Sequence, residues 1–85
     1  MDINRFPNKK AVEEQKADLE GADLSDAKLG GANLIGANLV NADLTGAMLR
    51  GANLFHAYLD DANLTGAMLR GQNLDDLKSS GAIIN

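Results

Sequence analysis

The chain has 85 residues, 45% apolar and only 4% aromatic, and its 12 acidic and 8 basic side chains give a formal charge of −4. This length supports one small domain at most, and the absence of cysteine excludes disulfides and cysteine-ligated zinc or iron–sulfur sites. No apolar run approaches the roughly 20 residues of a membrane span, and residues 1–16 lack the apolar core of a secretory signal, so we expect a soluble cytoplasmic protein without membrane contact.

Residues 1–16 are predicted to form an N-terminal cap. Asn8 is a residue type that caps helices, and Pro7 fits immediately before such a start. Whether the segment is a short helix through Lys16 or an irregular cap stays open from sequence. Either form would have apolar side chains available to cover one end of the fold, namely Ile3, Phe6, Ala11 and Val12.

From residue 17 onward the sequence repeats every five residues, as Ala-x-Leu-x-x. Two residues before each leucine stands alanine, until Gln72 interrupts the series. The leucines, which we predict to form the core, are Leu19, Leu24, Leu29, Leu34, Leu39, Leu44, Leu49, Leu54, Leu59, Leu64, Leu69 and Leu74. Two residues after leucine stands glycine or a residue type that tolerates a left-handed backbone, which predicts a turn with positive φ. The non-glycine residues at this position are Asp26, Asn41, His56, Asp61 and Asp76.

A period of five residues excludes both a helix and a long strand. On a helix each leucine would be rotated by about 140° from the last, so no apolar stripe would form. On a strand an odd spacing would send successive leucines to opposite faces. Only a chain that bends in every pentad keeps all the leucines on one side.

A longer repeat indicates how many pentads close one coil. The stretch Leu44–Gly51 recurs as Leu64–Gly71, 20 residues later, which favours four pentads per coil. From Ala17 to Leu74 the pattern resembles the pentapeptide-repeat family. The resemblance implies an all-β fold, a right-handed, quadrilateral parallel β-helix or solenoid, with leucine and the small residue pointing inward. We expect a cap at 1–16, the β-helix at 17–76, and degenerate repeats with a C-terminal edge at 77–85.

The last coil is predicted to be degenerate. Leu77 falls on an alanine position and Ser79 on a leucine position, while the phase continues weakly through Gly81, Ala82 and Ile84. Residues 81–85 would form an edge whose free backbone groups and isoleucines invite another chain to pair, so a homo-oligomer through this edge is one assembly that the sequence allows.

Stacking the pentads 20 residues apart arranges outward side chains in columns. Three columns have a structural interpretation, with stacked amides, hydroxyl pairs and packed thioethers between coils. They are Asn33, Asn53 and Asn73; Ser25, Thr45 and Thr65; and Met48 and Met68.

Acidic residues dominate two of the four outer faces. Some members of the family that the sequence resembles imitate DNA in shape and charge and bind DNA gyrase, so the resemblance implies a DNA-mimic surface as one hypothesis. An ordinary solvated surface is the other interpretation. The candidate residues are Asp18, Glu20, Asp23, Asp26, Asp43, Asp60 and Asp61.

Two further outer clusters are candidate binding surfaces. Outward apolar residues near one corner are a candidate partner patch, although they are also consistent with local packing. These residues are Ile35, Val40, Phe55 and Tyr58. A face without acids carries a basic column that would suit an anion or an acidic partner, or would simply be solvated. This column contains Lys28, Arg50 and Arg70.

No catalytic, metal or cofactor site is indicated. The single histidine, His56, occupies a turn position and cannot complete a zinc site without a second histidine or a cysteine. Carboxylate pairs such as Asp60–Asp61 and Asp75–Asp76 would lie at corners of a convex surface, whereas acid–base catalysis needs a concave site. We therefore expect no enzyme and no cofactor.

The sequence favours a protein-interaction or scaffold module that binds another protein through an outer face or the C-terminal edge. Direct nucleic-acid binding is not expected, because the domain is acidic and lacks stacking aromatics. The alternatives are a DNA mimic that binds gyrase or a related topoisomerase, and a repeat unit that assembles only with copies of itself.

Overall fold

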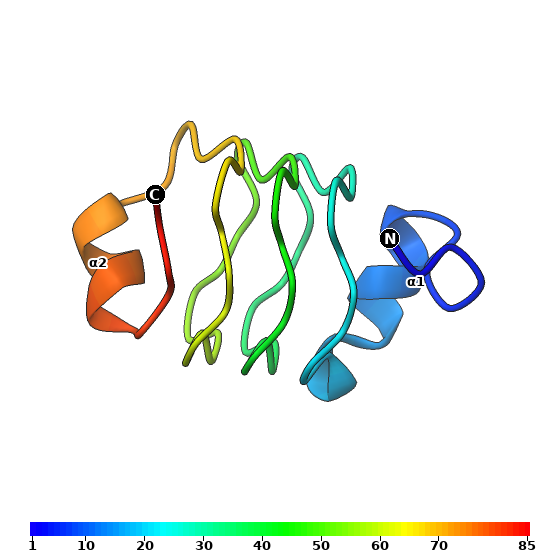
Figure 1. Ribbon diagram of the computed structural model, residues 1–85. Helices are drawn as coiled ribbons and strands as arrows, with labels where there is room; N and C mark the ends of the chain where they lie inside the picture. The colour runs from blue at the N-terminus through cyan, green and yellow to red at the C-terminus, as the bar shows by residue number, and fades with distance from the viewer.

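The structure, a computed structural model, describes residues 1–85. Helix α1, Lys9–Glu14, is followed by the 3-10 helix η1, Lys16–Asp18, and helix α2, Leu74–Ser79, lies near the C-terminus. Between these helices the chain winds in stacked coils, and the molecule measures 32 × 20 × 18 Å (Figure 1). None of the helices has the length and apolar character needed to cross a membrane.

Residues 20 positions apart pair in parallel across neighbouring coils, as the longer repeat predicts. The Leu29 N–H donates to the Met48 carbonyl at 2.9 Å, and the Met48 N–H donates to the Ala27 carbonyl at 2.9 Å. The resulting bridges are Asp23–Asp43, Lys28–Met48, Asn33–Asn53, Asn38–Tyr58, Asp43–Asn63, Met48–Met68 and Asn63–Ile83. All of them are isolated bridges, so the continuous strands and sheets implied by an all-β fold are not formed. The reason is the bend in every pentad, which limits each extended stretch to a few residues.

The turn positions have the left-handed backbone that the residue types predict. Asp26, Asn41, His56 and Asp61 have φ between 58° and 60°. These turns bring the chain around each corner while keeping every leucine on the inner side. The prediction for Asp76 is wrong, because this residue lies in α2.

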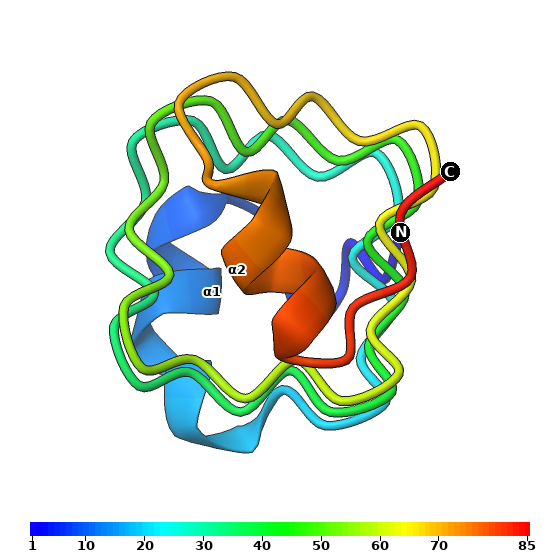
Figure 2. The ribbon, with the colours of Figure 1, turned by 90° about the vertical axis from the view of Figure 1, so that its left-hand side faces the viewer.

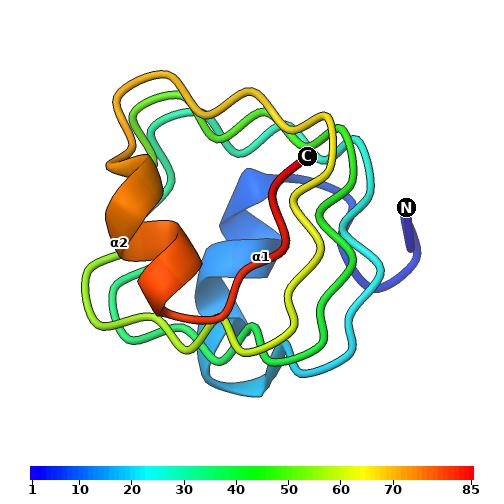
Figure 3. The ribbon, with the colours of Figure 1, turned by 60° about the vertical axis from the view of Figure 1, so that its left-hand side comes forward.

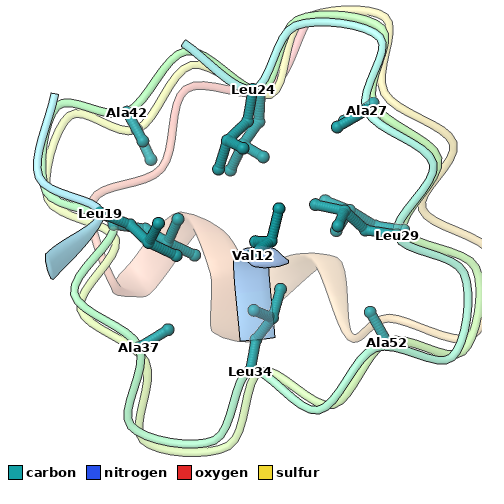
Figure 4. Packing of buried hydrophobic residues seen from close by; sticks show 14 of the residues in the cluster. Val12, Leu19, Leu24, Ala27, Leu29, Leu34, Ala37, Ala42 and Ala52 are labelled. Atoms are coloured by element: carbon teal, nitrogen blue, oxygen red, sulfur yellow. The ribbon is translucent and has the colours of Figure 1, made fainter. Parts of the chain in front are cut away.

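The leucines and alanines point to the centre of each coil (Figure 4). Nine of the twelve repeat leucines are buried, while Leu54 and Leu69 are partly buried and pack against the core. The core prediction is wrong for Leu74, whose side chain is 45% exposed. The chain has left the coil path before this residue, and Leu74 begins α2.

The N-terminal cap contains a helix, α1. The Asn8 side chain accepts a hydrogen bond from the Ala11 N–H at 2.9 Å, which is the N-cap that the residue type predicts. Phe6 and Val12 are buried in the core, whereas Ile3 is 69% exposed and so does not cover it. The chain enters the first coil through η1, residues 16–18, so α1 ends at Glu14 and not at Lys16.

The same cap satisfies backbone groups of the first coil that have no earlier coil to pair with. The Asp2 N–H donates to the Asp23 carbonyl at 3.1 Å, and the Lys9 ammonium donates to the Gly30 carbonyl at 3.2 Å. The Glu13 carboxylate accepts from the Asn33 N–H at 2.7 Å. These contacts protect the N-terminal edge of the stack.

At the other end α2 runs diagonally across the opening of the coils (Figure 2). Asn73 caps this helix, and Leu77 is buried against the core. Leu77 and Ser79 are therefore helical, which corrects the prediction of a degenerate coil at these positions. The last residues return to the side of the stack (Figure 3). There Ile83 pairs with Asn63.

Two of the predicted columns bond within each pentad instead of between coils. The Asn53 side chain accepts from the Phe55 N–H at 3.0 Å, and the Thr45 hydroxyl donates to Asp43 at 2.5 Å. Asn33 and Thr65 follow the same local pattern. The predicted hydrogen bonds along the amide and hydroxyl columns are therefore wrong, because these side chains bond to partners two residues away in the same pentad.

Candidate functional site

The candidate partner patch, here called the Phe55 surface, consists of Ile35, Val40, Phe55 and Tyr58. Ile35 and Phe55 occupy equivalent positions in successive coils, and the Gly36 N–H donates to the Phe55 carbonyl at 2.8 Å. Phe55 is 63% exposed and Tyr58 is 62% exposed. The structure thus places Ile35 beside Phe55, whereas Val40 is half-buried and lies in the column of Asp60.

The His56 ring extends the Phe55 surface. Its centroid lies 3.9 Å from that of the Phe55 ring, and the two planes are inclined by 50°. His56 itself has φ of 59° at the corner of the coil, as the turn prediction requires. Phe55 and His56 therefore form one exposed pair of rings at the corner of the coil, two residues before Tyr58 in the chain.

The seven candidate acidic residues are all exposed, but the N-terminal cap contacts two of them. The terminal ammonium of Met1 lies 3.1 Å from the Asp23 carboxylate, and Arg5 lies 3.7 Å from that of Asp18. Hydrogen bonds from Ser25, and then the terminal ammonium, lower the pKa of Asp23. No ion pair forms at Glu20, Asp26, Asp43, Asp60 or Asp61.

The candidate basic residues share one exposed face without an ion-pair partner. Arg50 and Arg70 are in register in successive coils, since the Gly51 N–H donates to the Arg70 carbonyl at 3.2 Å. Lys28 lies two residues away from their register, in the column of Met48 and Met68. The three cations therefore form a loose group, and no side chain gathers them around a common point.

A groove that sequence reasoning missed lies where α2 leaves the coil path. Its volume is about 450 Å³, and it is open to solvent. The groove is lined by Gly51, Ala52, Asn53, Leu54, Phe55, Gly71, Gln72, Asn73, Asp76 and Leu77. The break in the alanine series at Gln72 was the only signal of this departure. A second cavity, of about 370 Å³, lies between the N-terminal cap and the turn that contains Asp26.

No cluster of three or more His, Asp or Glu side chains is placed to hold a metal ion. His56 is at an exposed corner beside Phe55, and neither cavity contains it. The groove's one ionisable side chain, Asp76, has no ion-pair partner.

Comparison with known families agrees with the coil geometry. The family model for pentapeptide repeats matches residues 17–54 and 49–78, with eight copies of the repeat. The chain belongs to the pentapeptide-repeat family. A comparison with curated proteins found no similar sequence. Pentapeptide-repeat proteins are generally non-enzymatic, and membership of the family suggests a protein-interaction module without indicating a specific partner.

Proposed function

We propose that this pentapeptide-repeat chain is a non-enzymatic protein-interaction module whose rigid core is a right-handed, four-sided β-helix. The parallel bridges at a spacing of 20 residues support this form of the core, as do the inward leucines of each coil. A stack of this kind holds outer side chains at fixed positions, so a partner meets a preorganised surface.

The Phe55 surface is the proposed contact with the partner protein. The observation that carries this proposal is the placement of the aromatic side chains. Of the three Phe and Tyr residues, only Phe6 is buried, while Phe55 and Tyr58 are more than 60% exposed. Exposed aromatic side chains are typical anchors of protein interfaces. Affinity capture of a partner by the wild type and by Phe55→Asp tests the proposal, since the substitution should abolish capture without altering the fold.

A topoisomerase-directed DNA mimic is the alternative function. Its surface would be the acidic residues, of which Asp18 and Asp23 already lie close to cations of the N-terminal cap. Those contacts reduce the negative charge that a DNA-binding enzyme would meet, and they favour the Phe55 surface instead. Mimicry would also weaken steeply as salt rises, which separates the two functions.

Self-association through residues 81–85 is the remaining proposal for a partner. This segment already pairs with the third coil on one side, where the Leu64 N–H donates to the Ile83 carbonyl at 2.7 Å. Its other side is the edge at which a second copy would bind, with Ile83 exposed there. Sedimentation as a monomer at high protein concentration would contradict this assembly.

A further inference from the structure

Two backbone N–H groups of the second coil, those of Leu54 and His56, lack the hydrogen bonds that would join them to a following coil. One coil earlier, the equivalent donors Leu34 and Gly36 bond to carbonyls of the next coil, at 2.9 and 2.8 Å. Neither the Leu54 N–H nor the His56 N–H has a hydrogen-bond acceptor, because the chain that would supply one turns inward to form α2. Figure 2 shows this departure, where the orange segment leaves the outline of the coils.

Another part of the same edge is already satisfied from within the chain. The carbonyl of Ala52 would accept from a following coil, but it accepts from the Gln72 side-chain amide at 2.6 Å. The edge therefore presents two N–H donors, two residues apart, with no free acceptor between them. A ligand at this edge needs two carbonyl acceptors with the spacing of an extended peptide.

The groove next to this edge is partly apolar and contains one carboxylate. It runs between the second coil and α2, and its walls include Leu54, Phe55 and Leu77. Asp76 also lines it, and its neighbour Asp75 is exposed on the same helix. Neither carboxylate has an ion-pair partner.

We propose that an extended, cationic segment of a partner protein adds to the coil stack over residues 54–56. Two of its carbonyls accept from the Leu54 and His56 N–H groups, in parallel with the ladder below. The side chain between these carbonyls points toward Leu54 and Leu77 and is apolar, while a flanking Lys or Arg pairs with Asp76. This inference rests on the proposed interaction function, and it specifies the chemistry of the partner.

Amide exchange tests the inference directly. The probes are two capped peptides of about seven residues that alternate Val and Thr, one flanked by lysine and the other by glutamate. On the isotope-labelled full chain, the lysine-flanked peptide should slow exchange at Leu54 and His56 at least tenfold. Exchange at Leu34 and Gly36, already bonded in the free protein, should stay unchanged.

Three results obtained with the peptides would overturn the inference. They are an unchanged exchange rate at Leu54 and His56, equal binding of the glutamate-flanked peptide, and protection confined to Leu69 and Gly71, whose N–H groups also have no acceptor within the chain. Protection that increases with protein concentration and without peptide would also overturn it, because a second copy would then be the occupant.

Substitutions separate the charge contribution from the fold. Asp76→Asn should weaken the lysine-flanked peptide by about 1.4–5-fold, the range of an exposed ion pair. The matched control is Asp60→Asn, which removes an exposed carboxylate outside the groove and should leave affinity unchanged.

If a cellular partner binds the Phe55 surface while Leu54 and His56 stay unprotected, the strand inference fails and the proposed function stands. If the peptide protects them and no partner protein is captured, the proposed function fails instead.

Discussion

Gln72 donates its side-chain amide to the carbonyl of Ala52 at 2.6 Å and to that of Leu49 at 3.1 Å. In the regular coils, a backbone N–H from the next coil makes the bond to the alanine carbonyl, as Asn53 does to Ala32 at 2.8 Å. At residue 72 the chain is about to turn inward, and a glutamine replaces the missing backbone donor. Gln72, the one interruption of the alanine series, thus supplies the hydrogen-bond donor that the Ala52 carbonyl would otherwise lack.

Gln72→Ala should destabilise the protein even though it restores the repeat. The carbonyl of Ala52 would lose its donor, at a cost of about 1–3 kcal/mol in the free energy of unfolding, whereas that of Leu49 would keep the Ala52 N–H. Urea denaturation followed by circular dichroism measures this. Asn85→Ala is the control, since it removes an exposed amide bond to Thr65 and should change stability little. Equal stability of Gln72→Ala and wild type would contradict the capping role.

Leu44→Ala and Leu74→Ala should differ sharply. Leu44 is fully buried in the second coil, so its truncation leaves a cavity and costs about 2–5 kcal/mol. Leu74 carries the same side chain in the repeat pattern but lies exposed on α2, and its truncation should cost well under half as much. Similar losses for both variants in urea denaturation would show that Leu74 belongs to the core after all.

Asn41→Val should destabilise one corner of the stack. Asn41 has φ of 60°, and a β-branched residue adopts this conformation at a cost of about 1–2 kcal/mol or more. Asn41→Gly is the matched control and should leave the melting temperature near that of the wild type or raise it. Val and Gly variants that melt together would contradict the left-handed turn.

Much of the coil geometry is predictable because it depends on local spacing. The five-residue period of leucine determines which side chains point inward, and residues such as Asn41 and His56 mark corners through their tolerance of positive φ. The repeated stretch Leu44–Gly51 determines the pairing distance of 20 residues, since equivalent side chains stack in register.

The ends of the stack depend on tertiary competition that spacing does not reveal. Leu74 and Asp76 keep the repeat phase in sequence, yet residues 74–79 form α2, because the Asn73 side chain caps a helix that buries Leu77 over the core. The groove was missed for the same reason, since it exists only where the chain abandons its period. Gln72 was the available signal, and its role requires knowing which carbonyl lacks a donor.

Protonation of Asp23 at acid pH should lower the stability of the fold. Its pKa is lowered in the folded state, chiefly by hydrogen bonds from Ser25, so its contribution is fully present above the unfolded-state pKa, about 3.9. That contribution is lost as the pH falls through the lower, folded-state pKa. Unfolding measured from pH 6 to pH 2 should therefore show a shallower acid loss in Asp23→Asn than in wild type. Asp60→Asn is the control, and an identical pH slope for Asp23→Asn and wild type would contradict the assignment.

Affinity capture from a lysate of the source cells, at low and high salt, tests whether the Phe55 surface binds a protein partner. Wild type, Phe55→Asp and the control Met68→Asp, an exposed apolar residue on another face, are compared after circular dichroism shows that each is folded. We predict a partner that stays bound to wild type and Met68→Asp at high salt and is lost from Phe55→Asp. Recovery of a topoisomerase at low salt only, by all three proteins alike, would contradict the claim.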